Sequence, residues 1–254
     1  MKYFILYFFL LLLPISPARA SDIIEYHMHM APLETGVKRV ALTFDACMGK
    51  TDDRILSALV DNNIKATIFV TARWMKYNAR AIAILKAHPE IFEIENHGAQ
   101  HLPAVDEPKD VYGLQAAGSP DAIATEVEDG AAAVQADFGH WPSWYRGAGA
   151  VYTPSAMALV KTLDFKLGGF SMSGDGGAFW TAAHAEKAIA AAKNGDVIIA
   201  HINQPTKPAG EGVVQGILKL RESGFSFVTL DQGFPEHYPA QQRSPSNNSM
   251  RGPI

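Results

Sequence analysis

From residue 39 onward, short runs of apolar residues alternate with longer segments whose apolar positions follow a helical period. Several of the short runs are apolar almost throughout, which is typical of parallel strands covered on both faces. These runs predict strands at 40–44, 66–70, 92–95, 143–146, 165–170, 197–201 and 226–230. The segments between them predict helices at 53–62, 79–88, 120–138, 154–163, 182–193 and 211–223.

Regular alternation of strands and helices predicts an α/β domain built from right-handed βα units around a parallel sheet. The sheet could be open or closed. Closure into a barrel is favoured because no segment has the pattern of a polar edge strand. We place this single domain at residues 36–234.

Two segments depart from the alternation. Residues 101–120 contain Pro103, Pro108 and Gly113 and have no steady period, so they form either a functional lid or surface decoration. We expect a lid over the substrate groove. Residues 235–254 are polar and rich in proline, and we expect a disordered C-terminal tail.

The first residues predict export. Lys2 precedes an apolar run at 3–13, and Ala18-Arg19-Ala20 forms a small-x-small cleavage site, which together are typical of a secretory signal peptide. The run is shorter than the roughly 20 apolar residues of a membrane-spanning helix. We therefore expect cleavage after Ala20, no stable membrane anchor afterwards, and a periplasmic or secreted protein.

The composition of the chain limits the classes of partner that can be expected. The chain has 22 basic and 26 acidic residues, a net charge of −4, and nothing that forms a basic patch, so nucleic acid is not expected as a partner. Its one cysteine, Cys47, excludes an intrachain disulfide.

Polar residues stand at the ends of several predicted strands. In parallel α/β folds, reactive side chains gather where strands end and loops begin. A single histidine at such an end is more often structural, but five polar residues from different strands, directed at one rim, predict an active site. These residues are Asp45, His97, Arg146, Asp175 and His201.

The segment His97-Gly-Ala-Gln-His101 directly follows a predicted strand. Two histidines four residues apart on one helical turn face the same way, so both imidazoles could reach one metal ion. This spacing predicts that His97 and His101 bind a divalent metal, with zinc the first candidate.

Five segments in order resemble the motifs of the polysaccharide deacetylases with a NodB-type domain. They are Thr43-Phe44-Asp45, Glu93-Ile-Glu-Asn-His97-Gly-Ala-Gln-His101, Trp144-Tyr-Arg146-Gly, Ser173-Gly-Asp175 and Ile199-Ala-His201. The resemblance extends over about residues 37–230. It implies a distorted parallel (β/α) barrel, similar to a TIM barrel, with about seven strands, which agrees with the alternation of elements.

The resemblance also implies a role for each residue. Asp45 would take the proton of the attacking water, and His201 would protonate the departing nitrogen. Arg146 would pair with Asp45, and Asp175 would orient His201. A divalent metal on the two histidines, most simply Zn²⁺, would activate the water and polarise the carbonyl group.

The chain departs from the family where a second, metal-binding Asp usually follows Asp45, because that position is Ala46. Two imidazoles alone make a weak site, since catalytic zinc generally has three protein ligands. Asp52 is our candidate for the third ligand, although it could equally cap the helix predicted at 53–62. Cys47 is a further candidate, since thiolate binds zinc well, but a small buried thiol is the commoner case.

The third motif departs as well, because Arg146-Gly-Ala-Gly149 lacks the Pro and Tyr that usually follow the Arg in this family. We expect a metal-dependent hydrolase that removes acetyl groups from an N-acetylated polysaccharide or oligosaccharide. Two alternatives stay open: a hydrolase of another linear or cyclic amide, and a non-catalytic carbohydrate-binding relative.

Overall fold

The computed structural model describes residues 22–31 and 36–234. The predicted signal peptide at 1–20 and the predicted tail at 235–254 lie outside the described residues. Within the described ranges, no helix is both long and apolar enough to cross a membrane.

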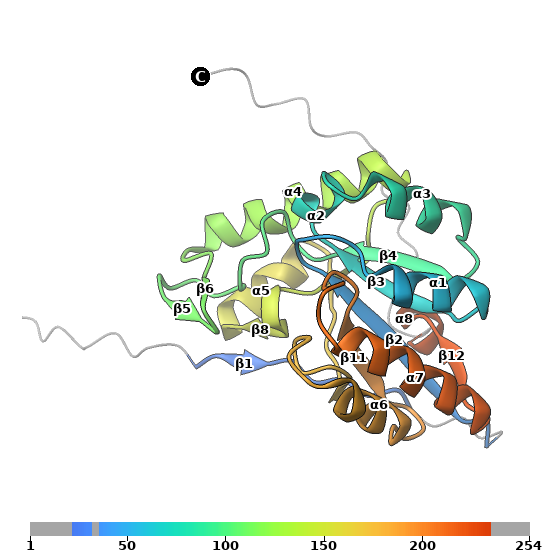
Figure 1. Cartoon of the computed structure of the whole chain (residues 1–254). Helices are drawn as coiled ribbons and strands as arrows, with labels where there is room; N and C mark the ends of the chain where they lie inside the picture. The colour runs from blue at the N-terminus through green and yellow to red at the C-terminus, as the bar shows by residue number, and fades with distance from the viewer. Residues whose placement is uncertain (1–21, 32–35, 235–254) are drawn as a thin grey trace, which may run out of the picture.

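An eight-stranded parallel sheet forms the centre of the molecule (Figure 1). Its strand order is β10 (Met172–Ser173), β11 (Val197–His201), β2 (Arg39–Ala46), β3 (Ala66–Val70), β4 (Phe92–Asn96), β7 (Trp144–Tyr145) and β9 (Lys166–Leu167), while β12 (Ser226–Val228) pairs with β2. The sheet curls into an open half-barrel, since no ladder among the described residues joins β9 to β10. All the strands predicted from the sequence are present, which confirms the distorted (β/α) barrel; β10 was not predicted.

Helices cover the outside of this sheet (Figure 1). They are α1 (Asp53–Asp61), α2 (Ala72–Met75), α3 (Ala79–Ala87), α4 (Pro120–Phe138), α5 (Pro154–Thr162), α6 (Ala182–Ala190), α7 (Ala209–Glu222) and α8 (Leu230–Gly233), with a 3-10 turn at Ala148–Ala150. The predicted helices are all found, with ends that differ by a few residues. The short α2 and α8 were missed because a single turn leaves no period in the sequence.

Strand alternation separates an apolar outer layer from the barrel interior, which is apolar along most of its length and polar where the strands end. In β2, Leu42 and Phe44 belong to the core between the sheet and its helices. Asp45, by contrast, points inward, where its carboxylate meets groups from other strands. Because side chains alternate along a strand, every second residue faces the barrel interior. The polar residues of the interior thus lie at one rim of the barrel, at the carboxyl ends of the strands.

Residues 101–120 are not a simple connection. They contain the hairpin of β5 (Asp110–Val111) and β6 (Leu114–Gln115), which lies near β8 (Val151–Tyr152) at the left of Figure 1. A small apolar cluster of Val105, Val111, Ala116 and Val151 fastens this segment to β8. β8 also pairs antiparallel with β1 (Ile24–Glu25). That the segment acts as a lid stays a prediction.

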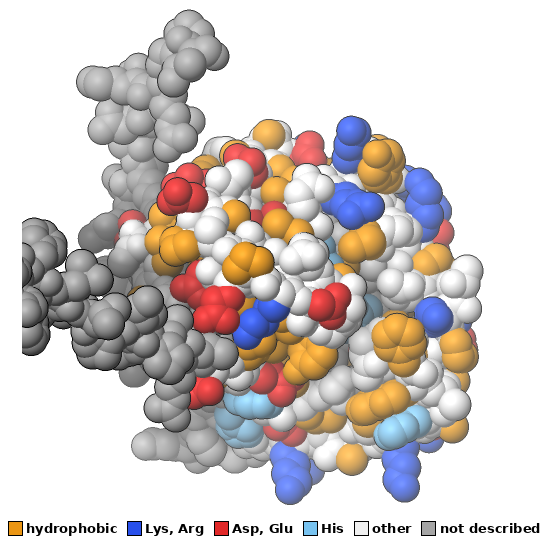
Figure 2. Space-filling model, turned by 90° about the vertical axis from the view of Figure 1, so that its left-hand side faces the viewer, with side chains coloured by type: hydrophobic (Ala, Val, Ile, Leu, Met, Phe, Trp, Pro, Cys, Tyr) orange, Lys and Arg blue, Asp and Glu red, His pale blue; other side chains and the backbone are white. Residues whose placement is uncertain are grey.

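The surface mixes side chains of all kinds. In Figure 2, acidic side chains gather in the left half of the face shown, and most Lys and Arg side chains stand at its right and lower margins. Hydrophobic side chains lie between them. Tyr112 of the hairpin and Phe179, in the loop between β10 and α6, are among the most exposed aromatic residues that the structure describes.

Candidate active site

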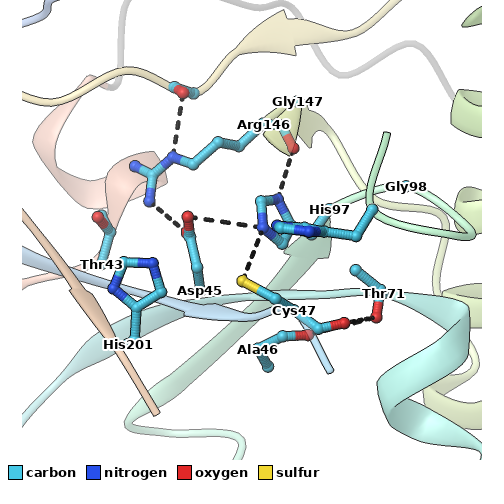
Figure 3. Close-up of polar contacts among 12 residues, drawn as sticks. Thr43, Asp45, Ala46, Cys47, Thr71, His97, Gly98, Arg146, Gly147 and His201 are labelled. Carbon is cyan, nitrogen blue, oxygen red and sulfur yellow. Dashed lines mark hydrogen bonds and ion pairs between the residues drawn. The ribbon is translucent and has the colours of Figure 1, made fainter. Parts of the chain in front are cut away.

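Asp45 and Arg146 form a buried ion pair at the barrel rim (Figure 3). Arg146 Nη1 donates to Asp45 Oδ1 at 2.8 Å, and both side chains are at most 2% exposed. The guanidinium is held on its other edge, because Nε and Nη2 donate to the carbonyl oxygens of Gly168 and Gly169. It also lies over the Phe69 ring, 4.1 Å from the centroid. The pair expected from the sequence is thus present, with the arginine fixed in one orientation.

His97 follows β4 and lies in the same buried space. Its Nδ1 is 2.7 Å from the carbonyl oxygen of Arg146. Because a carbonyl can only accept, Nδ1 must carry the hydrogen, so Nε2 is the nitrogen that faces the other groups of the site. Nε2 is 3.6 Å from Asp45 Oδ2 and 3.5 Å from Cys47 Sγ. A metal-binding histidine is typically oriented in this way.

His101 lies beside His97, with ring centroids 4.9 Å apart. The prediction that both lie on one helical turn is wrong, because residues 97–101 form an irregular turn in which His101 has a φ of 70°. This left-handed conformation is unusual for a residue other than glycine. The carboxylate of Glu126, from α4, accepts the N–H groups of Gln100, His101 and Leu102 and so holds the turn.

Cys47 is the third member of this group. Its Sγ and one nitrogen from each of His97 and His101 all lie within 4.8 Å of one another. The side chain is 6% exposed, and its backbone is held by Thr71, whose Oγ1 donates to the Cys47 carbonyl oxygen at 2.5 Å. The structure therefore brings together one thiol and two imidazoles, a donor set of the kind that binds zinc.

His201 ends β11, directly across from Asp45 in the parallel ladder between β11 and β2. Its Nδ1 is 3.1 Å from both carboxylate oxygens of Asp175, and its backbone N–H donates to Asp175 Oδ2 at 2.7 Å. The carboxylate fixes the ring and places the hydrogen on Nδ1, which leaves Nε2 for other chemistry. The expected pairing of Asp175 with His201 is thus seen.

The close contacts shift several pKa values. Burial alone would raise the pKa of Asp45, but the charges of His97, Arg146 and His201 outweigh it and lower that pKa. Burial alone would lower the pKa of His201, yet Asp175 raises it well above its usual value. Burial would likewise raise the pKa of the Cys47 thiol, but the neighbouring imidazoles of His97 and His101 hold it well below its usual value. The site thus favours a carboxylate, an imidazolium and a thiolate side by side.

Asp52 does not join this group, and its assignment as a metal ligand is corrected. It is the N-cap of α1, and Oδ1 accepts the backbone N–H of Arg54 at 3.1 Å. The Arg54 guanidinium also binds both of its carboxylate oxygens, at 2.8 and 2.5 Å. On its other side the carboxylate abuts Gly210 of α7, where an added Cβ would lie 2.2 Å from Oδ2. Capping and ion pairing thus direct it away from the two imidazoles.

The donor set fits a divalent metal, the cofactor expected from the sequence. Nε2 of His97 faces Cys47 Sγ at 3.5 Å, and Nδ1 of His101 is buried without a hydrogen-bond partner. A buried nitrogen without a hydrogen-bond partner is expected where that nitrogen binds a metal ion. Three protein ligands would leave open positions for water and substrate, as in catalytic zinc sites.

Solved structures of several known proteins are similar to this chain. A family 4 acetyl xylan esterase from Clostridium thermocellum, solved in complex with a cobalt ion, is 28% identical, with a TM-score of 0.62 over 78% of this chain and 91% of that chain. The T48 deacetylase with substrate is 24% identical, with a TM-score of 0.61 over 79% and 92% of the two chains. No curated protein matches the chain in sequence.

A family 4 pseudoenzyme from Bacillus anthracis is also similar, at 19% identity and a TM-score of 0.60. The match covers 78% of this chain but only 65% of that longer chain. Likeness at this level of identity shows a shared fold.

Fold and site define an α/β-barrel enzyme that carries its reactive groups where the parallel strands end. The sequence model of the family described as polysaccharide deacetylase matches residues 33–168, more than half of the chain. The chain therefore belongs to the polysaccharide deacetylase family and is a deacetylase enzyme.

Proposed function

We propose that this protein is an exported, metal-dependent deacetylase that hydrolyses the N-acetyl groups of amino sugars in a polysaccharide or oligosaccharide. One observation carries the proposal. The Asp45–Arg146 pair and the His201–Asp175 pair stand at one rim together with the Cys47, His97 and His101 group. A base, an acid and a set of metal ligands are what amide hydrolysis requires.

Each pair prepares one proton transfer. Arg146 keeps Asp45 charged and engages Oδ1, so Oδ2 is the oxygen that accepts the proton of the attacking water. Asp175 holds His201 through Nδ1, so Nε2 is the atom that donates a proton to the departing nitrogen. A divalent metal bound by Cys47, His97 and His101 would supply a Lewis acid, which lowers the pKa of bound water and polarises the acetyl carbonyl.

Acetate release tests the proposal. Metal-free and zinc-loaded protein would be incubated with N-acetylglucosamine oligomers, peptidoglycan, acetylated xylan and a panel of small amides. We expect zinc-dependent acetate release, fastest from the N-acetylated sugars, and none from a His97→Ala/His101→Ala variant. Faster release from xylan would favour an ester substrate, in line with the acetyl xylan esterase relative. Hydrolysis of small amides alone would favour the amide alternative, and no release at all would contradict a deacetylase role.

Export is the second part of the proposal. Its support is the basic start at Lys2, the apolar run at 3–13 and the small-x-small site ending at Ala20. N-terminal sequencing of protein expressed from the full reading frame should find Ser21 first, in the periplasm or the medium. Recovery of the uncleaved chain from the cytoplasm would contradict export.

A further inference from the structure

The thiol of Cys47 occupies the place in the site that a carboxylate would be expected to fill. In β2, Asp45 points into the barrel, and the next side chain, Ala46, packs in the outer core with the helices. Cys47 returns to the inner side, where Sγ faces His97 Nε2 at 3.5 Å (Figure 3). The position at which the family usually has its metal-binding Asp is thus apolar here, and the next residue faces the imidazoles.

The backbone around Cys47 is fixed, so the thiol is not placed by a flexible loop. Thr71 Oγ1 donates to the Cys47 carbonyl oxygen, and the Asn203 side-chain amide donates to the carbonyl oxygen of Met48. Gly49 has a φ of 93° and lies against the Asn203 backbone, with 3.1 Å between the carbonyl oxygen and an added Cβ. These contacts tie the end of β2 to the elements on either side of it.

We propose that Cys47, as a thiolate, is the third protein ligand of the metal, so that this enzyme has a Cys-His-His site in place of one with a carboxylate. The inference rests on the proposed metal-dependent function. A thiolate with two imidazoles is a softer donor set than a carboxylate with two imidazoles. It favours zinc, with cobalt(II) as a spectroscopic substitute, over Mn²⁺ and Mg²⁺, which prefer oxygen ligands.

The same geometry could suggest a different role, in which Cys47 is a nucleophile that takes up the acetyl group. Two features favour the ligand role. Sγ lies within 4.8 Å of nitrogens from both His97 and His101. Moreover, Nδ1 of His97 is hydrogen-bonded to a backbone carbonyl, as in metal-binding histidines, and not to a carboxylate that would assist a base.

Cobalt(II) spectroscopy tests the ligand directly. Purified protein would be stripped of metal with a chelator and titrated with Co²⁺ alone, while the near-ultraviolet absorption is followed for the thiolate-to-cobalt charge-transfer band. Because the chain contains a single cysteine, this band can come only from Cys47. We expect it to appear in the wild type and to saturate at one Co²⁺ per chain.

Three variants complete the experiment. Cys47→Asp keeps a ligand but no sulfur, so it should bind metal without the band and should shift preference from zinc towards Mn²⁺. Cys47→Ala should lose zinc affinity by roughly 100-fold or more, since removing a direct ligand exceeds the 10–100-fold loss that follows removal of an outer partner. In the third variant, His97→Ala, the thiol should become open to alkylation by iodoacetamide even with zinc present, whereas zinc should protect it in the wild type.

Stoichiometric cobalt without the band, or zinc affinity in Cys47→Ala within threefold of the wild type, would overturn the proposal. An acetylated Cys47 found by mass spectrometry in metal-free, active protein would overturn it in favour of the nucleophile. These outcomes differ from failure of the proposed function, in which the wild type would show the band when loaded with cobalt but, when loaded with zinc, would release no acetate from any substrate.

Discussion

Replacing Glu126 by Leu should remove the support of the turn that carries His101. Glu126 is 3% exposed on α4, and its Oε1 accepts the N–H groups of Gln100, His101 and Leu102 at 3.0, 2.8 and 3.1 Å. The variant would leave three consecutive N–H groups without an acceptor. An unsatisfied N–H group costs about 1–3 kcal/mol when buried, and these three are only partly buried, so we expect a total loss of about 1–3 kcal/mol.

The lost hydrogen bonds would destabilise a turn whose backbone is already strained. His101 has a φ of 70°, and a residue with a Cβ pays about 1–2 kcal/mol for this conformation. Without Glu126 the turn can relax to an ordinary conformation, which would move the imidazole away from His97. We therefore expect weaker zinc binding together with a melting temperature lower by roughly 2–12 °C, at about 2–4 °C per kcal/mol for a domain of this size.

The assay pairs chelator competition for zinc with calorimetry of the metal-free protein. Glu128→Leu on the exposed side of the same helix is the matched control and should change neither quantity. In the wild type, Oε2 of Glu126 also accepts the Gln100 N–H, at 2.9 Å. Glu126→Gln keeps the Oε1 acceptor but places an amide NH₂ group opposite that N–H, so its effect should lie between those of the wild type and Glu126→Leu. If Glu126→Leu bound zinc as tightly as Glu128→Leu and melted at the same temperature, the reasoning would be refuted.

Three further predictions concern other residues. Asp45→Asn and His201→Ala should each lower turnover by on the order of 10² or more, while each variant keeps one zinc per chain. Acetate release and metal analysis measure the two quantities, and a loss of turnover under tenfold would remove that residue from the proton transfers. Asp52→Asn should leave zinc affinity unchanged and lower the melting temperature by a few degrees, because the variant weakens the ion pair with Arg54 but keeps the helix cap. Weaker zinc binding by this variant would restore Asp52 as a metal ligand. Burial, with the nearby Glu93 charge, holds the pKa of Glu95 well above its usual 4.5. The free energy of unfolding of the wild type should therefore fall relative to that of Glu95→Gln as the pH rises above about 4.5, by up to about 1.4 kcal/mol per unit. A constant difference between the two proteins in urea unfolding from pH 4 to 8 would contradict this.

Much of the fold could be predicted because burial on both faces of parallel strands leaves an almost continuous apolar run. The run at 66–70 is buried at every position, and β3 has the predicted bounds. Helix α4 was also predicted to the residue, since Ser119 caps it, Pro120 begins it and Gly139 ends it in a left-handed conformation. The two-residue strand β10 could not be predicted, because so short a strand has no period of its own.

Part of the candidate site could likewise be predicted from the sequence, and part could not. That Asp45, Arg146, Asp175 and His201 meet at one rim could be predicted, because each follows a parallel strand, and the resemblance to the family implied the two pairings. Glu126 could not, because its partners are backbone N–H groups, which no side-chain pattern records. Its only signal is a carboxylate on a helix position that falls on the apolar, buried face.

The error over Asp52 and the importance of Cys47 have one physical origin. Distance along the chain does not decide which carboxylate or thiol reaches a metal; the face of the strand does, because neighbouring side chains point to opposite sides. Ala46 therefore faces the helices, while Cys47 faces His97. Asp52 lies past the loop, at the start of a helix whose exposed N–H groups compete for its oxygens, and Arg54 strengthens that competition. The ligand that reaches the imidazoles from the end of β2 is therefore the thiol at position 47, and its sulfur, in place of a carboxylate oxygen, should decide which metal the enzyme uses.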